Sequence, residues 1–338
     1  MTHITPDIHQ YIDRRTHAVK TETLFFDRTV QTIYSTLREN SAFAFNLLVS
    51  ARFSSLLGFL NYDFPIKKHT QNPEHLFHSL GINTHELYDA IHAYDSYRKI
   101  FERRIKYWEF RPMNPALEQV VSPADSRVLI GSFQTHHALF VKNKFFNYDE
   151  LVGEDKTQWL KTFEHGDFAV FRLTPDKYHY NHCPVSGRVL EIYEIDGKFH
   201  SCNPGAVVKS VTPYSKNRRV VTIIDTDVEG GTRMGKIAMI EIVALMIGKI
   251  VQRYSENRYD APAQIHPGQF IQKGQPKSLF RPGSSTTVLI FEKNRINFSQ
   301  DLVDNLAKPH VKSRFTTGFG KPMVETDIQV RQTIGTKK

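Results

Sequence analysis

Hydrophobic residues upstream of residue 115 recur at the spacing of amphipathic helices. Glycines are few in this part of the chain, and the apolar positions fall on one face of a helical wheel. Asn83 is a suitable N-cap for the last of these segments. The pattern predicts helices over 27–38, 42–61 and 84–106.

A different pattern begins after the prolines at 112 and 115. Short β-branched runs alternate with glycine-containing turns, which is typical of strands joined by tight connections. The clearest runs predict strands over 220–224, 237–245 and 286–291. We therefore expect an α+β fold, with a helical N-terminal region over 1–115 followed by a mainly antiparallel β-rich domain over 116–338.

The segment 43–60 is the most apolar part of the N-terminal region. Arg52 lies in its middle, where a charge is costly in hydrocarbon, so an amphipathic helix is expected rather than a membrane span. Such a helix could lie in a bilayer interface or pack against the β-rich domain, and the two positions are equally suitable. Its apolar face consists of Phe45, Leu48, Val49, Phe53, Leu56, Leu57 and Leu60.

Composition adds a charge excess to this picture. Hydrophobic residues make up 40% and charged residues 23% of the 338 residues, as in ordinary folded proteins. The formal net charge is +9, with basic clusters over 98–111 and 209–219 that suit an anionic membrane surface. No nucleic-acid motif accompanies them. The first twenty residues lack an apolar signal core and the chain has two cysteines, so we expect a cytoplasmic protein that binds the cytoplasmic side of a membrane peripherally.

Candidate chemistry lies in three segments of the β-rich domain, 122–125, 178–184 and 283–287. A serine hydroxyl needs a histidine to take its proton and a carboxylate to orient that histidine. His182 is the candidate base and Asp125 the candidate carboxylate. A serine in the tight Pro-Gly turn before the last predicted strand could attack the carbonyl in front of it, so the target would be the protein's own backbone.

These three segments resemble the phosphatidylserine decarboxylases, whose proenzymes cut themselves at a Gly-Ser-Thr-like motif and convert the serine into a pyruvoyl group. Further landmarks of the family follow in the expected order over 52–58, 101–112, 187–189 and 201–204, so the resemblance covers nearly the whole chain. In the common pattern the reactive serine precedes a threonine and lies six residues before a phenylalanine. Ser285 fits this count with Thr286 and Phe291, whereas Ser284 follows Gly283 but shifts the register by one.

The resemblance implies cleavage between Ser284 and Ser285 and a covalent pyruvoyl cofactor derived from Ser285, with Ser284 as the alternative. In such an enzyme the cofactor forms a Schiff base with phosphatidylserine, carbon dioxide leaves, and phosphatidylethanolamine is released. His179 would be the acid that protonates the decarboxylated substrate. The region 116–338 would then be the catalytic domain, and no metal is expected because no cysteine or acidic cluster joins His179 and His182.

Partners follow from the same resemblance. They are a phospholipid substrate, an anionic membrane surface and the two cleavage fragments bound to each other, with a homo-oligomer possible and no nucleic acid. The residue after His179 is commonly arginine in the family and is Tyr180 here, which favours a second hypothesis, a pyruvoyl-dependent decarboxylase of a soluble amino acid. A third is an uncleaved lipid-binding relative without activity.

Overall fold

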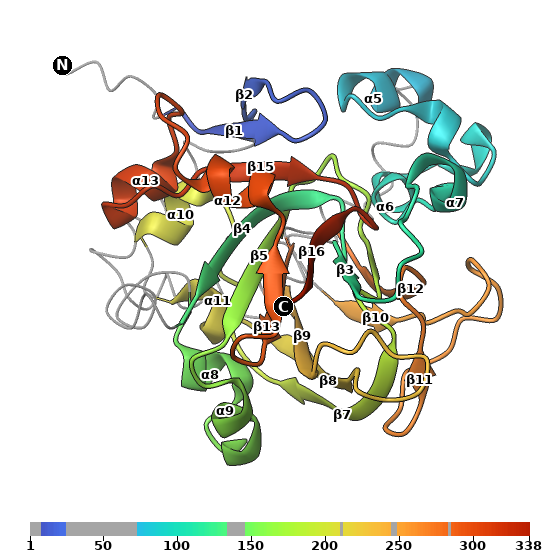
Figure 1. The fold of residues 1–338 in the computed structure, drawn as a ribbon. Helices are drawn as coiled ribbons and strands as arrows, with labels where there is room; N and C mark the ends of the chain where they lie inside the picture. Colours follow the sequence, from blue (N-terminus) through green and yellow to red (C-terminus); the bar gives the residue numbers. More distant parts are fainter. Residues whose placement is uncertain (1–7, 25–72, 134–145, 210–211, 245–248, 283–284) are drawn as a thin grey trace.

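The structure is a computed structural model that describes residues 8–24, 73–133, 146–209, 212–244, 249–282 and 285–338 (Figure 1). The predicted helices over 27–38 and 42–61, including the apolar face from Phe45 to Leu60, lie outside the described residues. Within the described part, strands outweigh helices and almost all strand neighbours are antiparallel. This confirms the expected α+β class, while the division at residue 115 stays a prediction.

A ten-stranded sheet forms the centre of the described fold. Its spatial order is β11 (Phe270–Ile271), β7 (Gly187–Ile195), β8 (Arg219–Asp225), β9 (Lys236–Val243), β13 (Ser285–Phe291), β5 (Asp167–Leu173), β4 (Ser126–Ser132), β15 (Glu325–Ile328), β1 (Gln10–Asp13) and β2 (Val19–Thr21). All neighbours are antiparallel except β1 and β15, which are parallel. The strands β8, β9 and β13 confirm the three strands predicted from the sequence.

Two smaller sheets accompany the large one. The first has the order β10 (Ile250–Gln252), β12 (Pro276–Phe280) and β6 (Tyr180–His182). The second has the order β14 (Ile296–Phe298), β16 (Thr333–Lys337) and β3 (Gln119–Val121). Since β12 belongs to a small sheet and β13 to the large one, residues 281–284 carry the chain from one sheet to the other.

Helices in the described part are short. Upstream of the sheets lie α5 (Pro73–Ser79), η4 (Thr84–Glu86), η5 (Ile91–Ala93), α6 (Tyr97–Phe101) and α7 (Tyr107–Phe110). Later come α8 (Tyr148–Val152), α9 (Thr157–Phe163), α10 (Pro204–Lys209), α11 (Pro213–Lys216), α12 (Gln300–Leu306) and α13 (Arg314–Phe319). No helix among the described residues has the length and apolarity needed to cross a membrane.

The single helix predicted over 84–106 is wrong, because this segment forms the two 3₁₀ turns η4 and η5 and the short helix α6 instead. Asn83 does cap the first turn, accepting a hydrogen bond from the His85 amide at 3.1 Å. The backbone then becomes extended at Leu87, which forms an isolated β-bridge with Ile105. An ion pair between Arg104 and Asp89 holds the fold-back, so tertiary contacts override the helical periodicity.

Strand β13 is buried on both faces, which explains its continuous apolar sequence. Val288 and Ile290 pack in the cluster that includes side chains of α8, α9, α10, α11 and α13. Leu289 and Phe291 pack on the opposite face, in the cluster that includes residues of β3, β11 and α12. Because side chains alternate along a strand, Ser285 and Thr287 share the face of Leu289. Figure 1 shows β13 at the centre of the molecule.

Candidate active site

Ser285 is the first residue of β13, and its main chain is held on both sides. It lies opposite Leu173 of β5 and Val243 of β9 in the sheet. The side chain is 1% exposed, and its Oγ has no hydrogen-bond partner among the described residues. Gly283 and Ser284 lie outside the described residues, so the choice of Ser285 over Ser284 stays a prediction.

His179 is a second buried group with an unused polar atom. Its Nδ1 lies 2.7 Å from the carbonyl oxygen of Lys177, which can only accept, so Nδ1 carries the hydrogen and Nε2 keeps a lone pair. Nε2 has no hydrogen-bond partner among the described residues. Burial first, and then the nearby Arg103 cation, lower the pKa of His179 to about 3. The ring packs against Phe101, with ring centroids 3.6 Å apart.

His179 lies beside the end of β12, from which the chain continues to Ser285. The Phe280 amide at the end of β12 donates to the His179 carbonyl at 3.0 Å, and residues 281–284 then lead to Ser285. Further along, the Thr287 hydroxyl donates to Asn181 Oδ1 at 2.9 Å. Asn181 follows His179 by two positions, and Thr287 follows Ser285 by two positions. Of the two candidate histidines, His179 is the one nearer to residues 281–284, which connect the two sheets.

His182 lies at the other end of β12, opposite Pro276. Its Nδ1 is 2.8 Å from the Gly274 carbonyl oxygen, and its Nε2 is 3.0 Å from the Tyr178 hydroxyl. Burial lowers the pKa of His182 to about 3, against the effect of the Gly274 bond and with help from the Arg331 cation. The neutral ring therefore donates to Gly274 and accepts from Tyr178, so both ring nitrogens are occupied.

Asp125 is buried and bound by a cation. The guanidinium of Arg111 donates to it at 3.0 and 2.8 Å, and the Val330 amide donates at 2.8 Å. Arg111 also donates to Glu86 at 2.8 Å. Burial by itself would raise the pKa of Asp125, but Arg111 outweighs burial and lowers this pKa below its ordinary value.

Asp125 and His182 are neighbours without a direct hydrogen bond between them. The His182 amide donates to the Pro123 carbonyl at 2.7 Å, which ties β6 to the loop that carries Asp125. The Asp125 carboxylate is turned to Arg111 instead. The triad of Asp125, His182 and Ser285 is therefore not assembled in the described conformation, and its catalytic roles stay predictions.

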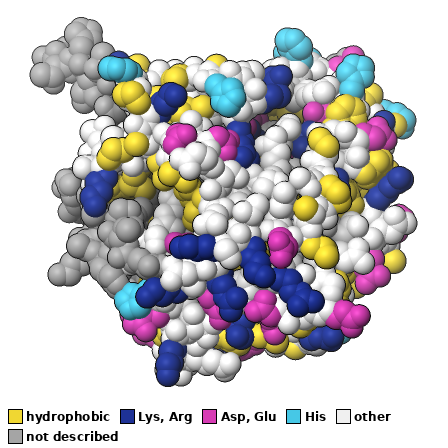
Figure 2. All heavy atoms as spheres, viewed as in Figure 1, with side chains coloured by type: hydrophobic (Ala, Val, Ile, Leu, Met, Phe, Trp, Pro, Cys, Tyr) yellow, Lys and Arg dark blue, Asp and Glu magenta, His cyan; other side chains and the backbone are white. Residues whose placement is uncertain are grey.

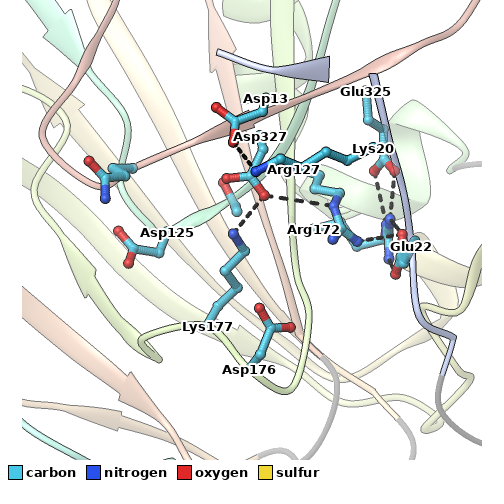
Figure 3. A network of polar contacts seen from close by, with 12 residues as sticks. Asp13, Lys20, Glu22, Asp125, Arg127, Arg172, Asp176, Lys177, Glu325 and Asp327 are labelled. Carbon is cyan, nitrogen blue, oxygen red and sulfur yellow. Dashed lines mark hydrogen bonds and ion pairs between the residues drawn. The ribbon is translucent and has the colours of Figure 1, made fainter. Parts of the chain in front are cut away.

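A network of buried charges extends from this site to the N-terminal strands, and no sequence motif marks it (Figure 3). Lys177, beside Asp125, donates to Asp327 of β15 at 2.6 Å. Further along, Arg172 of β5 contacts Glu325 at 2.5 Å and Glu22 at 2.6 Å. For Arg172 the sequence signal is a charged side chain within a largely apolar strand.

Three residues of this network have the ligand types of a metal site. Donor atoms of His9, Glu22 and Glu325 all lie within 4.8 Å of one another. However, Arg172 occupies both carboxylates, and a nearby cation disfavours a metal ion. His9 Nδ1 accepts from the Arg314 amide at 3.1 Å, so Nε2 holds the hydrogen that it donates to Glu325 at 2.7 Å. This donor set does not fit a metal.

Comparisons with known proteins identify the same family as the motifs. The family model described as phosphatidylserine decarboxylase matches residues 97–315. Three curated relatives are each named phosphatidylserine decarboxylase proenzyme. The protein of Fusobacterium nucleatum subsp. nucleatum is 29% identical over 303 residues, which cover 88% of this chain and 91% of the relative. That of Ruminiclostridium cellulolyticum is 29% identical over 296 residues, or 87% and 91% of the two chains.

The third relative, from Chlamydia pneumoniae, is 28% identical over 297 residues, which cover 88% of this chain and 91% of the relative. All three matches extend over most of both sequences. The family model by itself covers well over half of the chain. The chain therefore belongs to the phosphatidylserine decarboxylase family, a family of carboxy-lyases.

Proposed function

We propose that this chain converts phosphatidylserine into phosphatidylethanolamine with a pyruvoyl group that it makes from its own Ser285. Membership of the family supports the reaction. The observation that carries the proposal is a pair of buried groups without partners among the described residues, Ser285 Oγ and His179 Nε2, at the crossing between two sheets. A reactive serine and a neutral histidine in a water-poor site are what self-processing and turnover require.

Maturation would begin at the Ser285 hydroxyl. Its oxygen attacks the Ser284 carbonyl carbon, the amide C–N bond breaks, and an ester to Ser284 forms while the amide nitrogen becomes the Ser285 amine. Removal of the Ser285 α-proton then expels the Ser284 carboxylate and leaves dehydroalanine. Hydrolysis of this residue consumes one water, releases ammonia and gives the pyruvoyl group. The products would be residues 1–284 and residues 285–338.

His182 and Asp125 are the proposed base and orienting carboxylate of this step. In the described conformation, Tyr178 occupies His182 Nε2 and Arg111 occupies Asp125. The role therefore requires both contacts to open, so that the imidazole can accept the serine proton.

During turnover the pyruvoyl group at 285 would supply a carbonyl that takes up the substrate amine and accepts the electrons left as carbon dioxide departs. His179 is proposed to hold and deliver the proton that replaces the carboxylate. Burial holds the pKa of His179 at about 3, so the ring is neutral before the substrate binds. Acid catalysis by Nε2 therefore requires the bound anionic substrate to raise this pKa toward the working pH.

The two fragments are proposed to stay together after cleavage. Residues 285–338 contribute β13, which lies between β5 and β9, and β15, which lies between β4 and β1. They also contribute β14 and β16 to the second small sheet. The buried contact between Arg172 and Glu325 crosses the same boundary. Separation would expose these strands and charges, so the fragments should copurify under native conditions.

A membrane surface is the proposed location of the substrate. Figure 2 shows Lys and Arg side chains mixed with Asp and Glu over the lower part of one face. A soluble amino acid as substrate is supported by Tyr180, which is 5% exposed and stacks on Tyr178 in an aromatic cluster rather than presenting a cation. The excess of basic residues and the family support the phospholipid.

Intact mass and a substrate panel test the proposal. Wild-type protein should give two fragments, the smaller beginning with a pyruvoyl group at position 285, and should act on phosphatidylserine in vesicles. Ser285→Ala should stay uncut. A small fragment one residue longer would identify Ser284 as the nucleophile, and activity confined to a soluble amino acid would select the second hypothesis. An uncut wild-type chain without activity would contradict the proposed function.

A further inference from the structure

A buried polar cluster lies between the first small sheet and the large sheet, directly beyond Ser285. We name it the Glu241 network, and its members are Asn181, Glu241, Gln252, Lys277, Ser278 and Thr287. Lys277 Nζ lies 2.7 Å from Glu241 Oε2, and both side chains are fully buried. Gln252 Nε2 donates to the same oxygen at 3.2 Å. The other oxygen, Oε1, accepts from the Ser278 hydroxyl and, at 3.2 Å, from Asn181 Nδ2.

Four side chains of the network, Asn181, Gln252, Lys277 and Ser278, donate to the Glu241 carboxylate, whose oxygens accept. Asn181 must therefore turn its NH₂ group toward Glu241, which leaves its Oδ1 on the opposite side. That oxygen accepts from the Thr287 hydroxyl at 2.9 Å. The Lys277 cation balances the carboxylate charge, so the buried pair sets the orientation of the amide without leaving a net charge in the core.

Thr287 links this cluster to the reactive strand. It lies two residues beyond Ser285 on the same face of β13, and Glu241 is its partner in the neighbouring strand β9. Thr286, between them, points to the other face, where its hydroxyl donates to Cys202 Sγ at 3.1 Å. The contact between Asn181 and Thr287 is thus the first side-chain hydrogen bond past Ser285 on the face of β13 that carries the serine hydroxyl.

We propose that the Glu241 network is a positioning device for self-cleavage: through the Asn181 to Thr287 hydrogen bond it fixes the start of β13, so that Ser285 Oγ meets the preceding carbonyl. This inference rests on the proposed function, because it concerns the same serine. Asn181 and Thr287 are positioning residues that touch neither substrate nor the reacting atoms. An attacking oxygen must approach its carbonyl in a narrow range of distance and direction, so a small displacement slows the attack strongly.

The test measures cleavage rates of the full chain after pulsed cell-free synthesis. Thr287→Val keeps the side-chain shape and removes the hydroxyl, and it should slow cleavage about 10- to 100-fold. Thr287→Ser keeps the hydroxyl and should restore most of the rate. The matched control is Thr222→Val in β8, whose buried hydroxyl has no hydrogen-bond partner among the described residues. It should cleave like wild type.

A double-variant cycle separates positioning from general loss of stability. If one contact carries the effect, Asn181→Leu with Thr287→Val should cleave no more slowly than Asn181→Leu does. Hydroxylamine, which cuts esters, should release no fragments from Thr287→Val beyond those of wild type, since ester formation is the slowed step. Wild-type cleavage rates in folded Thr287→Val would overturn the inference. Absence of cleavage in wild type would instead contradict the proposed function.

Discussion

Arg172 offers a direct test of how the buried charge network stabilises the fold. Its guanidinium donates to Glu22 at 2.9 and 2.6 Å and to Glu325 at 2.9 and 2.5 Å, and all three side chains are buried. Burial by itself would raise the pKa of each carboxyl, but Arg172 outweighs burial and lowers both pKa values. Arg172→Met keeps much of the side-chain volume and removes the charge that both carboxylates share.

The expected loss is large. Removing one partner of a buried ion pair costs about 3–5 kcal/mol, because the remaining charge stays buried. The free energy of unfolding of a domain is about 5–15 kcal/mol, so Arg172→Met should lose a substantial part of it. Arg127 still contacts Glu22, and His9 still contacts Glu325, so the lower end of the range is expected.

The loss should also depend on pH, and the sign follows from the two carboxyls. In wild type their pKa values are lowered, so they contribute stability above the ordinary pKa of glutamate, and this stability disappears as the pH falls. Without Arg172, burial dominates and raises the pKa of both carboxyls. Protonation then removes their buried charges, so the destabilisation of the variant becomes smaller as the pH falls. The difference should be greatest near neutral pH and shrink in acid by about 1.4 kcal/mol per pH unit for each titrating carboxyl.

Urea unfolding followed by tryptophan fluorescence would measure the difference, with Ser285→Ala in every chain so that a single uncut polypeptide unfolds. Arg218→Met is the matched control, since Arg218 pairs with Glu194 and both side chains are nearly half exposed. It should change stability by less than about 1 kcal/mol. A loss from Arg172→Met below about 1 kcal/mol, or one that is equal at acidic and neutral pH, would refute the reasoning.

Three further predictions concern catalysis, pH and the membrane. His179→Ala should be cut normally but turn over about 10²- to 10⁴-fold more slowly, whereas His182→Ala should accumulate uncut chain; gel and decarboxylation assays distinguish the two. Burial lowers the pKa of both histidines to about 3. As the pH drops below about 6.5, the free energy of unfolding of uncut Ser285→Ala should therefore decrease, by up to about 1.4 kcal/mol per pH unit for each histidine. Binding to anionic liposomes should weaken with salt and be lost in Phe53→Ser/Leu56→Ser without loss of cleavage; failed cleavage would make 43–60 a packing element.

The strands that sequence predicts correctly are those whose neighbours bury them on both faces. β8, β9 and β13 each carry a β-branched run that no surface position interrupts. Strand β1 has no such run, and its pairing depends on β15, more than three hundred residues later. The break of 84–106 into short elements depends on the ion pair between Asp89 and Arg104, a contact that helical periodicity cannot show.

The sequence suggests the residues of the candidate site but not their hydrogen bonds. Asp125, His182 and Ser285 are suggested by motifs that carry the residue types the chemistry requires, and His179 by the family resemblance; their roles stay predictions. Spacing does not reveal that Arg111 binds Asp125, since the competing cation comes from another segment and is recognised by geometry. The partners of buried polar groups are set by the tertiary fold, so a local pattern cannot assign them.

The position of the proposed cleavage site is compatible with the sheet topology. A cut within a strand would interrupt a ladder of backbone hydrogen bonds, whereas residues 281–284 lie after β12 ends and before β13 begins. β12 stays paired with β6 and β10, and β13 with β5 and β9, on either side of that connection. Breaking the bond before Ser285 therefore leaves the pairing of β12, and of β13 from Thr286 onward, unchanged. The connection between these two sheets is thus a place where the fold can lose a peptide bond and keep its core.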